Sequence, residues 1–470
     1  NKQCGKSDAD LAKAFKAAQK IQRRDERARR FVFASTNAAA ARKAAQAARA
    51  DVDQPYSWES LEKEWRRGLE AFKTNDAGTA SAAWDAAAVG FQKAARLAAS
   101  NKIAAEAAAA AANAARTEAE RAVAANGATG LWQRGQDLAD ESARLQEAGK
   151  YGEARGKFED ALRIFGQARD AAEARQRFED AQKRYDLAYA AQLQTAETAV
   201  PDFADLLGKE MASAVDAAKT KQGAEEWDAG ATAYEDAIVL LPGKANAIRV
   251  RHALDGAEQN RAAGDLEGAL RKLAGALEID PGGAGVVAAR DRIGDEAFRR
   301  AFEILDCEPG RRPEATNLLS LAAAAKFVPA EFWVAWFGSQ GLYGFAVPSE
   351  TPGQVFDARK GDFRRLVKGA NPAALYSTGA YCEFLSTSSN RLQQAEQAYL
   401  AATNGGFTPA LVSLGRLWRA NKPPKAQKCL EDAAAGGNTK GMMELGQMLL
   451  DAAKNTNEAE RAMEWFEKAG

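Results

Sequence analysis

The chain has 470 residues, more than one compact core accommodates, so we expect several domains or one extended array. Its 64 basic and 64 acidic residues cancel, which removes any global electrostatic argument for nucleic acid or an anionic surface as the partner. A single histidine excludes multi-histidine metal sites, and four cysteines without a C-x-x-C spacing exclude a disulfide framework and a structural zinc pattern.

The first residues contain Gly5-Lys6-Ser7, the ending of a phosphate-binding loop, and a helix is predicted from Asp8. No apolar strand ending in Asp follows, and an Ala-rich repeat stands where an α/β domain would be required. We therefore interpret the match as a coincidence. Gly282-Gly283-Ala284-Gly285 is likewise no dinucleotide fingerprint, because it follows Pro281 in a predicted loop between helices and not a strand.

The N-terminal segment is locally basic. The range 13–49 holds eleven Lys or Arg residues against two acidic residues, and Leu11, Phe15 and Ala18 form an apolar stripe at helical spacing. We interpret this segment as a solvated helix face that is balanced by acidic repeats elsewhere. Contact with an acidic partner, nucleic acid or a lipid surface is the functional alternative. The lack of interleaved aromatic residues argues against base stacking.

A long repeat marks the N-terminal third. Three segments that begin with Phe recur at spacings of 76 and 74 residues: Phe15–Ala18, Phe91–Ala94 and Phe165–Ala168. Two Trp-x-x-Gly segments, at Trp65 and Trp132, lie 67 residues apart in the same scheme. No proline occurs between Pro55 and Pro201, which favours long helices. We predict helix pairs followed by a third long helix, repeated as an elongated bundle.

A shorter unit places a Gly, a small residue and a large residue at fixed offsets before a Pro. Its copies are Gly149, Ala154, Phe158 and Ala161; Gly264, Ala269, Leu273, Ala276 and Pro281; Trp227, Gly230, Tyr234, Ala237 and Pro242; and, more weakly, Asn75, Ala77, Ala80, Trp84 and Ala87. The Gly allows a tight turn, the small residue a close approach of two helices, and the Pro ends the second helix. This pattern resembles the tetratricopeptide repeat, which implies stacked antiparallel helix pairs that bind other proteins.

No catalytic constellation is visible. His252 lies in a predicted helix, where a surface or packing role is favoured over catalysis. Carboxylates alternate with Lys and Arg at helical spacing, as in the range 173–183, which is typical of a solvated helix face. We expect no cofactor and no metal.

Aromatic residues concentrate in a proline-richer stretch, Pro309 to Pro372. Trp333, Trp336 and Phe337 share one helical face, and Tyr343 follows closely. We favour core packing at a junction. The alternative is an exposed docking patch for a partner, because Trp and Tyr dominate binding hot spots. The longest uncharged run, residues 332–349, is interrupted by Gly and Pro and predicts no membrane span.

The last hundred residues carry a different repeat. First helices are marked by Gly379, Gly415 and Gly446, and second helices by three alanines, Ala395, Ala426 and Ala459, at spacings of 31 and 33 residues. Endings such as Glu464-Trp465-Phe466-Glu467-Lys468-Ala469 resemble the Sel-like repeat, a relative of the tetratricopeptide unit. The last copy stops in mid-pattern at Gly470, so we expect a longer protein.

These patterns predict an all-α fold: a right-handed α-solenoid of antiparallel helix pairs, with longer three-helix units in the N-terminal part. We expect four sections: residues 1–200 as a long-helix Ala-rich repeat region, 201–305 as tetratricopeptide-like repeats, 306–372 as the aromatic junction and 373–470 as Sel-like repeats.

The repeat resemblance implies a scaffold and no enzyme. We expect a protein or peptide partner docked on a grooved surface. Self-assembly into an oligomer or filament through the repeat ends is one alternative. The other is a regulatory arm of a larger enzyme, as in large bacterial proteins that contain such arrays. The isolated cysteines favour a cytoplasmic location.

Overall fold

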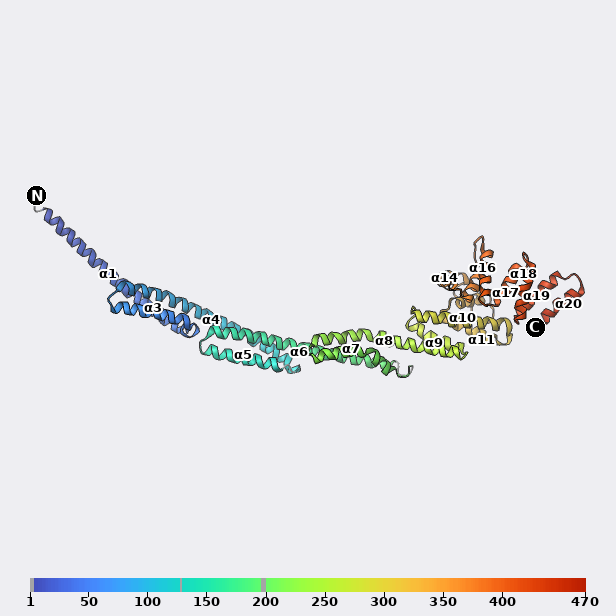
Figure 1. Ribbon diagram of the computed structural model, residues 1–470, viewed down its shortest axis with the longest axis horizontal. Coiled ribbons are helices and arrows are strands. Elements are labelled where there is room, and N and C mark those ends of the chain that lie inside the picture. Colours follow the sequence, from blue (N-terminus) through green and yellow to red (C-terminus); the bar gives the residue numbers. More distant parts are fainter. Residues whose placement is uncertain (1–3, 127–128, 196–199) are drawn as a thin grey trace. The chain divides into compact units, whose positions relative to one another are not determined.

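The computed structural model describes the backbone of residues 4–126, 129–195 and 200–470 (Figure 1). Side chains are described for the same residues except 4–15, 17–19, 21, 22, 124–126 and 309. Within these ranges the chain forms 20 α-helices and one short 3-10 helix, and no described residue lies in a strand. The predicted all-α helical-repeat class is therefore confirmed.

The chain divides into two units, which we describe separately. Unit 1 comprises Asn1–Leu187 and Ser213–Ile238, and unit 2 comprises Ala188–Ala212 and Val239–Gly470. The four sections expected from the sequence stay a prediction. The helices that contribute to unit 1 are α1 (Cys4–Ala47), α2 (Ala50–Asp53), α3 (Pro55–Lys73), α4 (Ala77–Asn126), α5 (Thr129–Glu147), α6 (Tyr151–Gln194), α7 (Phe203–Gly223) and α8 (Trp227–Ala262).

The first three-helix group of unit 1 consists of the second part of α1, α3 and the first part of α4 (Figure 1). Alanines of α1, among them Ala34, Ala38 and Ala45, are almost fully buried, so the helix backbones approach closely. Their small volume leaves room for two large rings of the neighbouring helices. Trp58 of α3 packs against Phe91 of α4 with 4.8 Å between ring centroids.

The second three-helix group repeats this arrangement with the second part of α4, α5 and the first part of α6. Trp132 packs against Phe165 with 5.3 Å between ring centroids. Each ring lies 74 residues after its counterpart in the first group, Trp58 or Phe91. The long period in the sequence therefore corresponds to a repeated three-helix packing.

A single carboxylate joins the two groups. Asp53, in α2, accepts a hydrogen bond of 2.7 Å from the backbone N–H of Gly152 and another of 2.7 Å from the Asn101 side chain. Gly152 lies in the first turn of α6, where free N–H groups and the helix dipole favour an anion. Helix α6 is thus capped by Asp53, which lies 99 positions before Gly152 in the chain.

Further along unit 1, α6 packs against α8 through aromatic rings. Phe178 lies 5.6 Å from Trp227 and 5.4 Å from Tyr234, between ring centroids. Gly230 permits this approach, because a Cβ there would lie 2.8 Å from the Phe178 ring.

Pro242 does not end a helix as predicted, because α8 runs from Trp227 to Ala262 through it. Its side chain is exposed, so the backbone carbonyl that loses its N–H partner can bind water. Pro281 agrees with the prediction, since it lies just after α9.

Unit 2 contains smaller helices after the end of α8. They are α9 (Leu266–Ile279), α10 (Ala284–Cys307), the 3-10 turn Pro309–Arg311, α11 (Arg312–Ala324), α12 (Val328–Ser339), α13 (Pro352–Ala358), α14 (Lys360–Lys368), α15 (Pro372–Phe384), α16 (Arg391–Asn404), α17 (Pro409–Trp418), α18 (Pro423–Ala435), α19 (Thr439–Ala452) and α20 (Thr456–Ala469). The last six form three antiparallel pairs.

Each of these three pairs places a glycine of its first helix against a large side chain of its second helix. The contacts are Gly379 with Tyr399, Gly415 with Leu430, and Gly446 with Phe466. A Cβ at Gly379 would lie 2.5 Å from ring carbons of Tyr399. The glycines that mark the first helices in the sequence are therefore points where the two helices of a pair approach closely.

Helix α10 connects successive pairs. Asp295 accepts a hydrogen bond of 3.0 Å from the Asn371 side chain at the start of α15. One turn later, Arg299 donates to the Gly405 carbonyl after α16, at 3.4 Å. Near the end of α10, Asp306 accepts a hydrogen bond of 3.0 Å from the Asn438 side chain at the start of α19. The spacing of polar residues along α10 thus fixes the positions of the pairs in unit 2.

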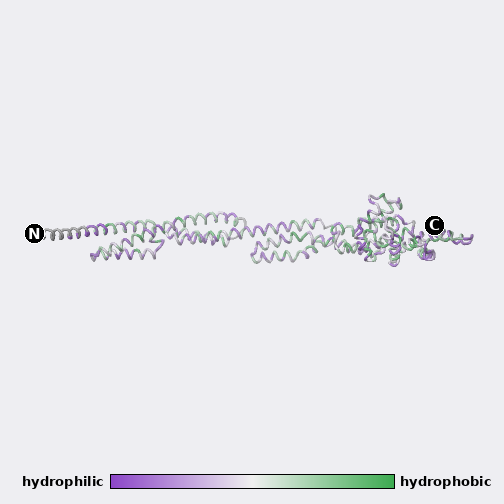
Figure 2. Tube along the Cα trace, turned by 90° about the horizontal axis from the view of Figure 1, so that it is seen from above, coloured by the Kyte–Doolittle hydropathy of each residue, from purple (hydrophilic) through white to green (hydrophobic). Residues whose placement is uncertain are grey.

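Hydrophilic and hydrophobic residues alternate along the helices (Figure 2). Among the described residues, no helix is both long enough and apolar enough to span a membrane.

Candidate protein-binding surface

The described residues offer little for chemistry. No group of three or more His, Cys, Asp or Glu among them could hold a metal ion. His252 is half-buried within α8. The backbone of Gly5-Lys6-Ser7 is helical, within α1, and so does not form a phosphate-binding loop. The carboxylates in the range 173–183 pair with neighbouring Arg and Lys, as Glu179 does with Arg175 at 3.1 Å.

Of the four residues predicted to dock a partner, two are buried and two are half-buried. Trp333 and Phe337 are 6% and 4% exposed and belong to the core of unit 2. The Trp333 ring stacks on Tyr376 with 5.1 Å between centroids, and its N–H donates to the Ser377 hydroxyl at 3.0 Å. Trp336 and Tyr343 are half-buried. A docking role stays a prediction, and only these last two present surface for it.

Left-handed backbone brings Tyr343 back over α12. Gly341, Tyr343 and Gly344 have φ values of 65°, 54° and 77°, so the chain reverses sharply after the helix. The Tyr343 ring then meets the Phe337 ring edge-on, with 5.0 Å between centroids. The non-glycine residue in this conformation is thus held by a core aromatic side chain.

Trp336 begins an exposed rim that continues onto α15 and α17. Its ring lies 5.4 Å from that of Phe384, which is 45% exposed. The Arg416 guanidinium lies over the Phe384 ring at 5.0 Å from its centroid. Arg416 is fixed by Glu383, with both carboxylate oxygens at 3.2 Å, and Glu383 also accepts a 2.8 Å hydrogen bond from the Tyr399 hydroxyl. The cation therefore sits in a defined position above an exposed ring.

Two more cations flank Tyr343. Arg312 and Lys440 lie 5.9 and 6.0 Å from the centroid of its ring. Lys440 forms an ion pair of 2.9 Å with Asp306, whose side chain is 4% exposed. We call the set Trp336, Tyr343, Phe384, Arg312, Arg416 and Lys440 the aromatic–cation surface.

Neighbouring carboxylates keep two cations of this surface, Lys440 and Arg416, charged. Burial disfavours the charged form of Lys440, but the neighbouring Asp306 outweighs that effect and raises the lysine pKa above its ordinary value. Burial likewise opposes the charge of Arg416, and Glu383 outweighs it, so the pKa is raised. Beneath them, burial raises the pKa of Tyr376 to about 12. The surface thus presents cations over a neutral aromatic floor at physiological pH.

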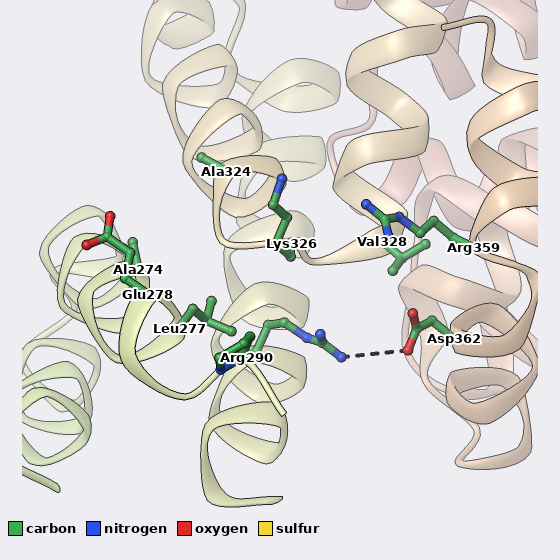
Figure 3. Close-up of a pocket in the computed structure, with 10 residues that line it drawn as sticks. Ala274, Leu277, Glu278, Arg290, Ala324, Lys326, Val328, Arg359 and Asp362 are labelled. Carbon is green, nitrogen blue, oxygen red and sulfur yellow. Dashed lines mark ion pairs between the residues drawn. The ribbon is translucent and has the colours of Figure 1, made fainter. Parts of the chain in front are cut away.

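A hollow of about 480 Å³ lies elsewhere in unit 2, between α9, α10, the turn from α11 to α12, and the start of α14 (Figure 3). Arg290 points across it toward Asp362, at 4.0 Å, and also contacts Asp291 at 3.0 Å. Arg359 pairs with Glu331 at 3.1 Å. Its arginines have carboxylate partners, as Arg416 and Lys440 do, but none of its lining residues is aromatic, so the hollow lacks the rings that the aromatic–cation surface offers a partner.

Sequence reasoning missed Phe384, Arg416 and Lys440. No repeat position marks Arg416, because the residues that follow the equivalent glycines are Ala380 and Gln447. The predicted apolar stripe of Leu11, Phe15 and Ala18 concerns side chains outside the described residues.

Comparisons with known proteins add little. No protein-family model matches the chain, and no curated protein matches it. A crystal structure of a Sel1 repeat protein from Oxalobacter formigenes is similar at 18% sequence identity, with a TM-score of 0.27. That match covers 55% of this chain and the whole of the other chain. A likeness this remote transfers no residue and no role, so the class of helical-repeat protein rests on the architecture described above.

Proposed function

We propose that the chain is a non-catalytic scaffold that binds a protein or peptide partner at the aromatic–cation surface. The observation that carries the proposal is the joint exposure of aromatic rings and fixed cations on packed helices. Rings and guanidinium groups of this kind supply most of the energy in protein interfaces. Because core side chains and buried carboxylates hold these groups in place, little entropy is lost when a partner binds.

The partner chemistry follows from the same surface. Arg312 forms no ion pair with another described residue, and Arg416 and Lys440 keep part of their side chains exposed. A peptide with an aromatic or aliphatic anchor next to carboxylates would meet both the rings and the cations. We therefore infer a short acidic and apolar segment as the partner.

We further infer that the three pairs of α15–α20 are Sel-like repeats and that residues 201–305 contain tetratricopeptide-like units, with residues 306–372 as the junction between them. The recurring contact of a glycine with a large side chain in each pair supports this reading, because one packing rule then repeats at one register. The lengths of α1, α4 and α6, which are 44, 50 and 44 residues, support residues 1–200 as a long-helix Ala-rich repeat region.

A peptide-display selection against the full chain tests the function. We expect selected peptides to share acidic residues beside an apolar anchor. Their affinity, measured by calorimetry, should fall about tenfold or more in the double variant Trp336→Ala/Phe384→Ala. Tyr56→Ala is the matched control, since this ring is 90% exposed in unit 1. Selected peptides that bind the double variant as well as the parent chain would refute the assignment.

A further inference from the structure

A second surface lies in unit 1, where α1 passes the turn between α3 and α4. A cleft of about 360 Å³ opens there. Its lining residues are Arg24, Arg27, Ala28, Phe31, Phe72, Asn75 and Ala77, and we call it the N-terminal cleft. Phe31 is half-buried and Phe72 is 54% exposed, and their rings stack with 5.1 Å between centroids. The floor of the cleft is therefore aromatic and open to a ligand.

Unpaired positive charge borders this floor. Arg29 and Arg30 form ion pairs with Asp25 and Glu26 on the same helix, at 3.3 and 3.7 Å. That leaves Arg23, Arg24 and Arg27, which are exposed and form no ion pair with another described residue. A ligand with carboxylates beside apolar side chains would satisfy both features.

The 74-residue repeat shows what covers the equivalent position further along unit 1. Phe31 corresponds to Ala105, which is fully buried. Asn75, in the turn before α4, corresponds to Gly149, in the turn before α6, and both have left-handed backbone. At that second turn, Arg49 side-chain carbons lie 3.3 Å from where a Cβ of Gly149 would be. Arg49 lies in the turn between α1 and α2, so a turn of the chain packs on the second turn, and no described residue packs in this way on the first.

The first turn also differs from the second in how its helix is capped. Asp76 accepts a 3.0 Å hydrogen bond from the Thr79 backbone N–H, so α4 is capped by its own neighbour. Helix α6 instead depends on Asp53. A ligand in the N-terminal cleft therefore need not cap α4, and its carboxylates can pair with the arginines.

We propose that the N-terminal cleft is the docking site for an acidic amphipathic helix of a separate partner protein. The apolar side of that helix lies on Phe31 and Phe72, and its carboxylates face Arg23, Arg24 and Arg27. A helix fits because an amphipathic helix presents apolar side chains to the rings and carboxylates to the arginines at the same time. The concave floor favours a helix over a flat lipid surface, although Val32 and Phe33 are exposed elsewhere on α1 and make an anionic membrane the rival to exclude.

Two synthetic peptides provide the probe. One is an amphipathic helix of Leu, Ala and Glu, labelled with fluorescein, and the other has the same composition in scrambled order. Both are titrated with the full chain, and binding is followed by fluorescence anisotropy. We expect the amphipathic peptide alone to bind, and its affinity to fall about tenfold in Arg24→Glu/Arg27→Glu, the scale of close charge pairs at an interface. Phe72→Ser should weaken it without any change of charge.

A matched control carries the same charge change elsewhere. Arg66→Glu/Arg134→Glu reverses two exposed arginines that form no ion pair with another described residue, and it should leave the affinity unchanged. Circular dichroism checks that all variants fold. The titrations are repeated in the Trp336→Ala/Phe384→Ala background, which removes the aromatic–cation surface as a second site for an acidic peptide, so this proposal and the proposed function fail independently.

Three results would overturn the proposal. Equal binding of the scrambled peptide would reduce the effect to charge attraction. Binding to phosphatidylserine vesicles that the cleft variants abolish, without peptide binding, would assign the surface to membranes. Concentration-dependent growth in light scattering that the same variants abolish would assign it to a second copy of the chain.

Discussion

Substitution of Gly379 by alanine tests whether the glycine contacts hold the helix pairs together. The new Cβ would lie 2.5 Å from two ring carbons of Tyr399. The ring has little freedom to move away, because it is almost fully buried and its hydroxyl is bound to Glu383 at 2.8 Å. Overpacking of this kind costs about 1–3 kcal/mol.

Alanine also improves helix propensity, by about 0.5–1 kcal/mol relative to glycine. We therefore expect Gly379→Ala to lower the free energy of unfolding by about 1–2 kcal/mol. Gly275→Ala is the matched control, because Gly275 lies within α9 and no atom is found within 4 Å of its Cβ position. This control keeps only the propensity gain and should stabilise the chain.

Urea denaturation followed by tryptophan fluorescence measures both variants, since four of the nine tryptophans lie in unit 2 and five in unit 1. Unfolding of two units need not be one transition, so the midpoint of the step that reports on unit 2 is compared. The reasoning is refuted if Gly379→Ala and Gly275→Ala shift that midpoint in the same direction by the same amount.

Three further predictions concern polar groups that are buried or half-buried. Burial raises the pKa of Tyr376 from 10.0 to about 12, so the folded state holds this proton more tightly than the unfolded chain does. The contribution of this group to stability should be full below pH 10 and fall by about 1.4 kcal/mol per pH unit from there to pH 12, and Tyr376→Phe should remove this part of the fall in urea midpoints. Asp53→Ala should cost about 1–2 kcal/mol as a lost helix cap, and hydrogen exchange at Gly152 should accelerate, whereas unchanged exchange would contradict the capping role. Asp306→Ala should cost about 1–3 kcal/mol in thermal unfolding, since it leaves Lys440 without its ion-pair partner, and Asp306→Asn should cost less.

Sequence patterns predicted local geometry better than contacts between distant residues. Gly149 and Gly264 were predicted at turns, and both adopt left-handed backbone between helices. The Phe repeat predicted a long period, because Phe91 and Phe165 occupy equivalent buried positions. Such features recur at fixed spacing, so one sequence is enough to reveal them.

The contacts that the sequence did not reveal join residues that have no common period. Asp53 and Gly152 are 99 positions apart, and Asp306 and Lys440 come from different parts of unit 2. At Pro242 a local sequence rule was wrong, because the proline lies inside α8 and does not end a helix. The position is exposed, so water can bind the carbonyl that lacks a backbone N–H partner. Helical spacing also could not separate Trp333 from Trp336, since burial depends on which neighbouring helices pack on each side.

The aromatic–cation surface depends on groups beneath it as much as on those it exposes. Glu383 holds Arg416 over Phe384, and Asp306 holds Lys440 beside Tyr343. Both carboxylates are at least nine-tenths buried, so they cannot contact a partner themselves. Under the proposed function, they fix each cation before a partner arrives, which removes the entropy cost of ordering a long side chain. On this proposal, Glu383 and Asp306 contribute to affinity through the orientation of Arg416 and Lys440, although no partner touches either carboxylate.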